Sequence, residues 1–272
     1  MAGKKKDTSL LHHLIGSRSL VWNLAKNDIK KKFAGSYFGV VWAFVQPVIT
    51  VLLYWFVFEK GLNSKATDLR TGIEIPFVLW LTAGLVPWFY FQEALNGGTG
   101  VLVEYSYLVK KVVFPVVKMI SALFTHLFFV AFTIVLFICM GYMPDWYALQ
   151  VVYYSFCMIL FATGLVYATS AVTVFFRDMK EVVGILLQIG MWVTPIMWNF
   201  ETMVQIPGWA ITVLKLNPMY YIVSGYRNAL INHIGFWEDM GLTVYFWVVT
   251  AVILFLGTTV FKRLRPHFAD VL

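Results

Sequence analysis

The chain has 272 residues, of which 60% are hydrophobic and only 13% are charged. A soluble domain carries about 25% charged residues, so this composition excludes a soluble globular protein and indicates an integral membrane protein. The net charge of +7 does not indicate a nucleic-acid partner, because the bases lie in segments that flank apolar stretches. Cys139 and Cys157 both lie inside such stretches, and we expect small core residues, not a disulfide or a metal pair.

Residues 1–36 precede the first apolar span. No continuous apolar region follows Lys4–Lys6, so we expect no cleaved signal peptide. From about Ser17 the segment fits a helix with a polar, basic arc and an apolar arc. The polar arc holds Asn23, Lys26, Asn27 and Lys30, and the apolar arc holds Leu20, Val21, Leu24, Ala25 and Ile29, with Asp28 and Lys32 as intruders. This pattern predicts an amphipathic helix in the membrane interface, and a loose basic tail is the alternative.

Six apolar stretches follow, and each is read as a membrane span against a hydrocarbon thickness of about 30 Å. They cover residues 37–58, 76–92, 116–140, 149–176, 182–198 and 240–261. Pro47 in the first and Pro195 near the end of the fifth predict kinks. The expected fold class is an all-α integral membrane protein, a single transmembrane domain with six helices.

The loop over residues 96–115 is too polar, and too broken by glycines and Pro115, to cross a bilayer. Its middle, Val101–Lys111, predicts a short surface helix that Asn96 and Thr99 can cap. A soluble partner could push on such a helix, and a solvated loop helix without a special role is the alternative. The candidate coupling residues are Val101, Glu104, Tyr105, Tyr107, Leu108 and Lys110.

Residues 199–239 contain two apolar pieces that are too short to span comfortably, Ile206–Leu216 and Met219–Ile231. Asn217 and Pro218 between them form a typical helix start, with Asn as the cap and Pro in the first turn. We expect two short half-helices, re-entrant or interfacial, on the side opposite the N-terminus.

Charge placement tests this topology. With six spans, sixteen of the 21 Lys and Arg residues fall on the side that holds both termini. The five on the other side are Lys60, Lys65, Arg70, Lys215 and Arg227. Cytoplasmic segments carry the excess of bases, so both termini are expected in the cytoplasm.

No source of energy is found within the chain. It lacks a G-x-x-x-x-G-K-[ST] phosphate loop, and it lacks the H-E-x-x-H and G-x-S-x-G motifs. A channel or an ion-coupled carrier would bury ionisable groups in its spans, and only His126 lies there; a structural role is the simpler interpretation of that histidine. An intramembrane enzyme would need paired carboxylates, and Glu93, Asp178 and Glu181 are scattered. We therefore expect the membrane half of an ATP-driven machine.

Aromatic residues are dense near the span ends, where most belong to interfacial belts. A minority could line a passage, because flat rings offer an apolar face to sugar rings. The candidates for a passage lining are Trp42, Trp88, Phe89, Trp192 and Trp198, together with Arg227. Arg227 either meets an anionic group or snorkels to lipid headgroups, and snorkelling is the favoured interpretation.

Three stretches carry a resemblance to a known family: Phe33–Ile49, Phe175–Trp198 and Asn217–Arg227. With them the chain resembles, over nearly its whole length, the permease subunits of ABC-2 type exporters of lipid-linked bacterial polysaccharides. Three further stretches look most like wall teichoic acid permeases of the TarG/TagG type: Tyr54–Phe58, Ile75–Phe89 and Phe268–Leu272. O-antigen and capsule exporters share most of this pattern, and the stretch around Phe114–Lys118 is shorter than is usual.

The resemblance implies a homodimer joined to two separate ATPase subunits, which hold ATP and Mg while this chain binds no cofactor. It implies that the helix within Val101–Lys111 docks on the ATPase, and that Lys26, Lys30, Lys31 and Lys32 lie at the interface where substrate enters. The implied substrate is a polymer on undecaprenyl diphosphate, moved to the outer leaflet of a bacterial plasma membrane, and no nucleic acid is involved. A teichoic acid is the expected polymer, with O-antigen, capsule, or an ABC-2 drug or lipid exporter as alternatives.

Overall fold

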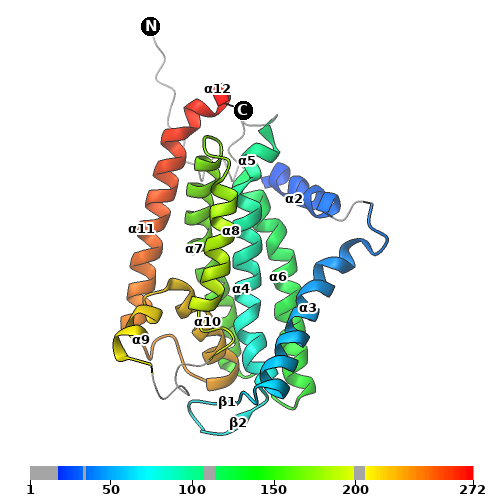
Figure 1. Ribbon diagram of the computed structural model, residues 1–272, viewed down its shortest axis with the longest axis vertical. Helices are drawn as coiled ribbons and strands as arrows, with labels where there is room; N and C mark the ends of the chain where they lie inside the picture. The colour runs from blue at the N-terminus through cyan, green and yellow to red at the C-terminus, as the bar shows by residue number, and fades with distance from the viewer. Residues whose placement is uncertain (1–17, 33–34, 107–113, 199–205, 272) are drawn as a thin grey trace.

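The apolar stretches fold into long helices, as expected for a chain of this composition. The computed structural model describes residues 18–32, 35–106, 114–198 and 206–271 (Figure 1). The helices, in chain order, are α2 (Arg18–Lys32), α3 (Trp42–Trp55), α4 (Phe77–Thr99), α5 (Val101–Glu104), α6 (Phe114–Cys139), α7 (Gln150–Thr173), α8 (Met179–Val193), α9 (Gly208–Lys215), α10 (Pro218–Arg227), α11 (Met240–Leu264) and α12 (Phe268–Val271). Short 3₁₀ segments, η1 (Gly39–Val41), η4 (Trp146–Leu149) and η7 (Arg265–His267), and short π segments, η2 (Phe56–Gly61) and η6 (Asn228–Asn232), adjoin several of them.

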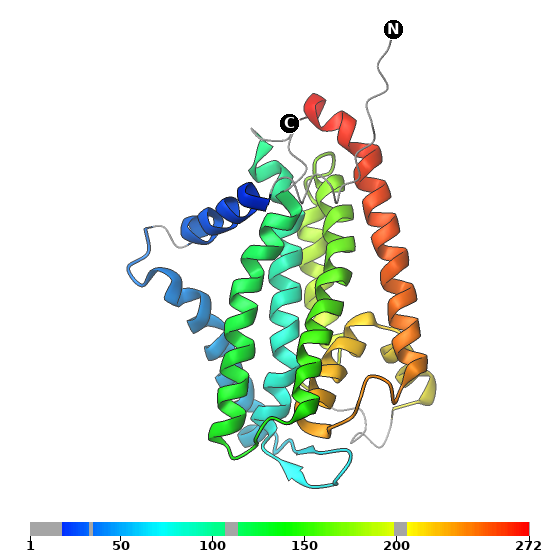
Figure 2. The ribbon, with the colours of Figure 1, turned by 180° about the vertical axis from the view of Figure 1, so that it is seen from behind.

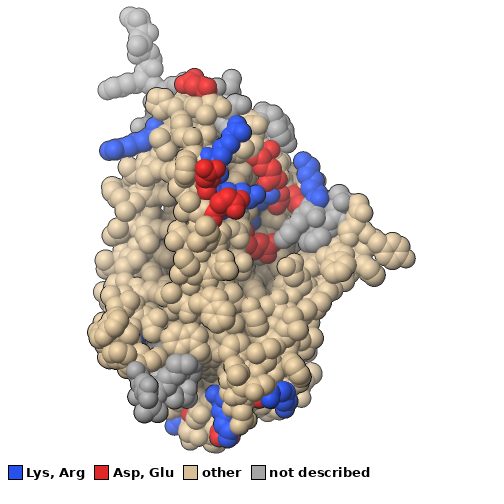
Figure 3. All heavy atoms as spheres, viewed as in Figure 1, with Lys and Arg blue, Asp and Glu red and all other residues tan. Residues whose placement is uncertain are grey.

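The two ends of the molecule differ in what they carry. Helices α2, α5 and α12 lie at one end, and α9, α10 and the short strands lie at the other (Figures 1 and 2). Both views show α3 inclined away from the other helices near α2 and approaching them near the strands. On the face shown in Figure 3, charged side chains gather toward both ends, and the lower middle of the molecule is almost free of them. This distribution suits a protein whose middle lies in hydrocarbon.

Four helical segments of the described chain are long and apolar enough to cross a membrane. They are Trp42–Gly61, Pro115–Cys139, Trp146–Thr173 and Met240–His267. The other two expected spans fold as α4 and α8, which do not meet that standard. With 15 residues, α8 is about 22 Å long at 1.5 Å per residue, less than the roughly 30 Å of hydrocarbon. The multi-pass character is therefore clear, and the number six stays a prediction.

Helix α4 is the centre of the fold. It contacts α3, α6, α7, α8 and α10, and side chains on all its faces, such as Leu79, Ala83 and Leu85, are completely buried. A helix that is apolar all round belongs inside a protein. The sequence does not indicate that α4 is central, because all the expected spans are similarly apolar.

Helices α7 and α11 form the most extensive helix–helix contact in the described part of the chain. A Cβ atom on Gly164 of α7 would lie 2.8 Å from the backbone nitrogen of Leu254, and Gly257 of α11 lies directly against Gly164. Small residues let helix backbones approach in membranes, where packing and not water exclusion drives association. The glycines therefore fix the crossing point of these two helices.

The loop after α4 differs from the expected one. Helix α4 continues through Gly97 and Gly98 to Thr99, because Gly98 packs so tightly against Val166 of α7 that a side chain would not fit. Asn96 and Thr99 do not cap α5, because both lie within α4 and the N-cap of α5 is Gly100. The Thr99 hydroxyl instead donates to the Leu95 carbonyl oxygen at 2.7 Å. Within the helix expected over Val101–Lys111, the structure has the single turn α5 at Val101–Glu104, and residues 107–111 lie outside the described residues.

Two further expectations were incomplete. The fifth expected span ends at Val193, because Thr194 adopts an extended backbone that ends α8. The fold class was expected to be all-α, but the loop between α3 and α4 contains two short antiparallel strands, β1 (Ala66–Thr67) and β2 (Glu74–Ile75), with Ala66 opposite Ile75. The fold is therefore mostly helical and not strictly all-α.

The two short helices expected within residues 199–239 are present as α9 and α10. The cap predicted between them is confirmed, since the Asn217 side-chain oxygen accepts from the backbone nitrogen of Met219 at 3.0 Å and Pro218 opens α10. Helix α10 is buried between α4, α7 and α11. The turn η6 then extends α10 and leads to the left-handed residue His233.

Candidate functional site

Three elements meet through charged side chains at the end where α2 and α12 lie. Asp28 of α2 accepts a hydrogen bond from Lys118 Nζ of α6 at 2.6 Å and another from the Tyr105 hydroxyl at 3.0 Å. Lys118 Nζ also lies 3.0 Å from Glu104 Oε2 of α5. The Asp28 and Lys118 side chains are only 9% and 14% exposed. We call these four residues the α2–α5–α6 junction.

The junction rests on an apolar cluster that ties α5 to three more helices. Val101, Leu102 and Tyr105 pack with buried residues from the ends of α7, α11 and α12: Tyr167, Ala171, Val174, Phe261 and Phe268. A partly buried ion pair is maintained only when its hydrogen bonds are satisfied, as they are for Asp28. Helix α2, the turn α5 and the start of α6 are therefore held together as one unit.

The predicted coupling residues separate into two groups. Val101 and Tyr105 are buried inside the chain, so neither offers its side chain to a docking partner as the sequence suggested. The Glu104 side chain is 52% exposed and remains accessible. Tyr107, Leu108 and Lys110 lie outside the described residues.

The bases of α2 point outward, as the helical pattern predicted. Lys26, Lys30 and Lys31 are exposed, and the side chain of Lys32 lies outside the described part of the chain. Lys26 Nζ lies 5.3 Å from the centre of the Trp22 ring, and Lys31 Nζ lies 5.7 Å from that of Tyr105. Cations over aromatic faces are attracted by the ring quadrupole, so these contacts orient the bases.

The inclination of α3 leaves a groove between it and helices α4 and α6, with one wall residue from α8. The groove has a volume of about 630 Å³. Its polar lining is made of amide and hydroxyl side chains and one acid: Gln46, Thr50, Tyr54, Gln92, Glu93, Asn96 and Thr125. Aromatic rings line it as well, among them Trp42 and Phe89, two of the predicted passage residues. No Lys or Arg is among the described residues that line this groove.

The other aromatic candidates lie elsewhere. Trp88 is buried, with its ring against Gly190 of α8, so it belongs to the helix core. Trp192 is 57% exposed on the outer surface of α8. Trp198 donates its indole hydrogen to the Trp192 carbonyl oxygen at 2.9 Å and lines a different pocket at the far end of the molecule.

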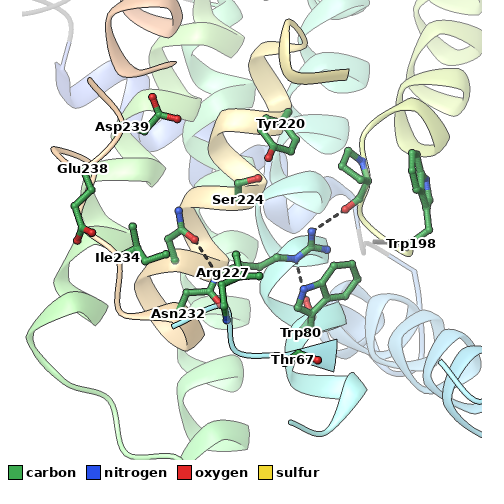
Figure 4. Close-up of a pocket in the computed structure, with 13 residues that line it drawn as sticks. Thr67, Trp80, Trp198, Tyr220, Ser224, Arg227, Asn232, Ile234, Glu238 and Asp239 are labelled. Atoms are coloured by element: carbon green, nitrogen blue, oxygen red, sulfur yellow. Dashed lines mark hydrogen bonds between the residues drawn. The ribbon is translucent and has the colours of Figure 1, made fainter. Parts of the chain in front are cut away.

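Arg227 does not snorkel, contrary to the favoured interpretation. Its guanidinium is buried and lies over the Trp80 ring, 3.3 Å from the ring centre. It donates to the carbonyl oxygen of Pro195 at 2.7 Å (Figure 4) and to that of Ile196, also at 2.7 Å. These carbonyls belong to the turn that follows α8, so Arg227 joins α10 to the end of α8 and to α4. The sequence could not predict this contact, because a helical-wheel plot of α10 does not reveal the unpaired carbonyls in the turn after α8.

His126 has a structural environment, as predicted. Its Nε2 lies 3.2 Å from the Ser155 hydroxyl and 3.1 Å from the Tyr226 hydroxyl, deep between α6, α7 and α10. Neither partner is ionised at neutral pH, and no second buried base or acid lies against it among the described residues. The cluster therefore holds three helices together.

Comparison with known proteins places the chain in a family. The family model described as ABC-2 type transporter matches residues 19–231, which covers most of the chain. The chain belongs to the ABC-2 type transporter family. The match runs from α2 to η6 and so contains the α2–α5–α6 junction, the groove and Arg227. Members of this family are membrane subunits of transporters and not themselves catalytic.

Curated relatives align over nearly their full length. The chain is 26% identical over 266 residues to the O-antigen export system permease protein RfbA of Myxococcus xanthus, which covers 96% of this chain and 98% of the relative. It is 22% identical over 258 residues to the protein of the same name from Klebsiella pneumoniae, with 92% and 93% covered. The broad resemblance to ABC-2 permeases is confirmed. The narrower resemblance to teichoic acid permeases is not supported by these relatives, which are named for O-antigen export.

Proposed function

We propose that the chain is the membrane permease of an ATP-driven exporter that moves a lipid-linked cell-surface polysaccharide of the O-antigen type to the outer leaflet. The observation that carries this proposal is the near full-length similarity to two permeases named for O-antigen export. We propose an O-antigen type polymer as the cargo in place of the teichoic acid expected from the sequence. The proposal includes six membrane-crossing helices, both termini in the cytoplasm, a homodimer and two ATPase subunits.

The groove beside α3 supports a glycan as cargo. Its amide and hydroxyl groups can exchange hydrogen bonds with sugar hydroxyls, and Trp42 and Phe89 offer faces to sugar rings. The lipid diphosphate fits this groove poorly, because Glu93 is acidic and the described lining contains no Lys or Arg. We therefore assign the groove to the sugar chain.

The diphosphate has a better partner on α2. Lys26, Lys30 and Lys31 are exposed at the end of the molecule that the charge bias places in the cytoplasm. Bases at a membrane surface attract anionic headgroups by roughly 1 kcal/mol each. In this mechanism α2 collects the diphosphate at the inner surface, and the attached glycan enters the groove beside α3.

The α2–α5–α6 junction supplies the link to the motor. An ATPase that displaces the exposed Glu104 edge of α5 also displaces Lys118 and Asp28, because the three side chains are bonded together. Motion of the partner is thus passed directly to the start of α6 and to the helix that holds the diphosphate. The linkage explains why an acid interrupts the apolar arc of α2.

Purification of the tagged chain from its native membrane tests the function. We expect mass spectrometry to find an ATPase subunit in equal amount and a polyprenyl-linked glycan. Glu104→Arg should reduce the amount of bound ATPase. The control is Glu74→Arg, which changes an ion-paired acid in β2 at the opposite end of the molecule and should leave the ATPase bound. A chain that purifies alone, and whose lipid vesicles pass ions, would show that a channel and not an exporter is the correct class.

A further inference from the structure

The turn α5 depends on its surroundings for its position. It contains only the four residues Val101–Glu104, and a single helical turn is not stable by itself, because nucleating a helix costs more than one turn returns. The Val101 and Leu102 side chains are 0% and 2% exposed. The turn is therefore held in place by the apolar residues on which these two side chains pack.

The residues behind α5 form a cluster of their own. It joins Val101 and Leu102 to Tyr167 of α7, Phe261 of α11 and Phe268 of α12. It is separate from the larger core that fills the space between the long helices. A change inside the smaller cluster should therefore loosen α5 and leave the larger core intact.

The chain turns toward this cluster after α11. Helix α11 ends at Leu264, and Pro266 lies in the 3₁₀ turn η7 that follows. Proline has no backbone N–H with which to continue an α-helix, so its position favours a change of direction here. Both views show α12 leaving the end of α11 on the side of α5 (Figures 1 and 2).

Phe268 is the one buried side chain among those described in η7 and α12. It is 1% exposed. The other described side chains of the segment are exposed or half-buried: Arg265, Pro266, His267, Asp270 and Val271. The packing that this segment contributes to the cluster therefore comes through a single ring.

Two edge-to-face ring contacts connect Phe268 to the neighbours of α5. The centres of the Phe268 and Phe261 rings are 5.6 Å apart, and those of Phe261 and Tyr167 are 5.0 Å apart, with the ring planes nearly perpendicular in both pairs. This is a preferred arrangement of aromatic rings. Removal of the Phe268 ring would leave a cavity beside Phe261 that the surrounding residues fill only in part.

We propose that Phe268 is a positioning residue for α5, through which α12 fixes the turn on which the ATPase acts. With the ring in place, displacement of the exposed Glu104 edge moves α5 together with the ends of α7 and α11. Without it, α5 gives way locally, and less of the motion reaches the long helices. The role of the ATPase in this inference rests on the proposed function, whereas the positioning of α5 does not.

Hydrogen exchange on the full chain in lipid nanodiscs tests the positioning, and it requires neither substrate nor ATPase. The reporters are the backbone amides of Glu104 and Tyr105, which close the turn with hydrogen bonds of 3.1 and 3.0 Å. Exchange rates report local opening, so we expect both amides to exchange at least tenfold faster in Phe268→Ala, while the amides of α4 keep their natural rates. Val271→Ala, at an exposed position of the same helix, should change none of them. Natural rates at Glu104 and Tyr105 in Phe268→Ala would overturn the inference.

The amount of glycan moved per ATP hydrolysed tests the consequence. The chain and its co-purified ATPase are reconstituted together, and both rates are measured in the same vesicles. We expect Phe268→Ala to lower the ratio at least fivefold, while ATP hydrolysis stays within twofold of that of the natural complex. A parallel fall of both rates would indicate a merely structural role and would overturn the inference.

Phe268→Leu guards against a misfolded Phe268→Ala. Leucine keeps an apolar side chain at the site and leaves a smaller cavity, so we expect exchange rates and a transport ratio between those of the natural chain and Phe268→Ala. If Phe268→Ala does not fold, natural values for Phe268→Leu in both measurements overturn the inference. If the natural complex exports glycan and Phe268→Ala keeps its ratio, only this inference fails; if the natural chain binds no ATPase and moves no glycan, the proposed function fails, and hydrogen exchange still decides the positioning of α5.

Discussion

The ion pair between Asp28 and Lys118 should contribute substantially to the stability of the fold. Asp28→Ala removes hydrogen bonds of 2.6 Å from Lys118 and 3.0 Å from Tyr105, and leaves an ammonium group that is 14% exposed. Breaking a buried pair typically costs 3–5 kcal/mol. Lys118 keeps its contact with Glu104, so we expect the lower end, a loss of about 3 kcal/mol in the free energy of unfolding.

Unfolding of the purified chain in mixed micelles measures this loss. Asn27→Ala, an exposed neighbour on the same helix, should change the free energy of unfolding by less than about 0.5 kcal/mol. The double variant Asp28→Leu with Lys118→Met should recover most of the loss, because paired charges can be replaced together by apolar groups. A cost below about 1 kcal/mol for Asp28→Ala, or a double variant as costly as the two single changes added, would refute the reasoning.

Three further changes test other parts of the structure. Gly164→Val should prevent the close approach of α7 and α11 and lower the midpoint of thermal unfolding by several degrees. Gly184→Ala, at a position with open space around it, should leave the midpoint unchanged. Equal midpoints for the two variants would contradict this packing. Arg227→Gln should cost about 2 kcal/mol or more in the free energy of unfolding, because carbonyls are left buried and unpaired, and unchanged stability would show that they find other donors. Burial of Asp68 tends to raise the pKa of its carboxyl, but hydrogen bonds from Thr71 and from backbone nitrogens outweigh it and hold that pKa below its usual value. Stabilisation by Asp68 should therefore be complete above about pH 4 and lost as the pH falls through the lowered pKa; hydrogen exchange of this loop should show that acid sensitivity in the natural chain and not in Asp68→Asn.

The helices were largely predictable because the bilayer imposes a simple rule on the sequence. Apolar stretches of about 20 residues gave the positions of α3, α6, α7 and α11, and a residue pair with specific backbone preferences, Asn217 and Pro218, gave the start of α10. These signals are local, so no tertiary information was required.

The misses arose where packing overrides local preference. Gly97 and Gly98 look like helix breakers, yet α4 passes through them because Gly98 fits against Val166. The burial of Arg227 depends on two carbonyls in the turn after α8, more than 30 residues away in the sequence. In each case the deciding partner lies in a distant part of the sequence.

The α2–α5–α6 junction carried a signal that was visible but not interpreted. Asp28 interrupts the apolar arc of α2, and Lys118 stands at the start of an apolar span, where a base needs a partner. An acid on the apolar side of one helix and a base at the edge of another predict an ion pair between them. Their adjacency still required the fold, because α2 and α6 are separated by two other long helices.

Transport in inside-out vesicles tests the central claim most directly. The vesicles would contain the chain and its ATPase partner, with a labelled polyprenyl-diphosphate-linked glycan in the outer-facing leaflet. The account predicts that ATP makes the glycan inaccessible to an added glycosidase, and that vesicles with ADP leave it accessible. Equal protection with and without ATP, or glycan movement in vesicles that contain this chain alone, would contradict it.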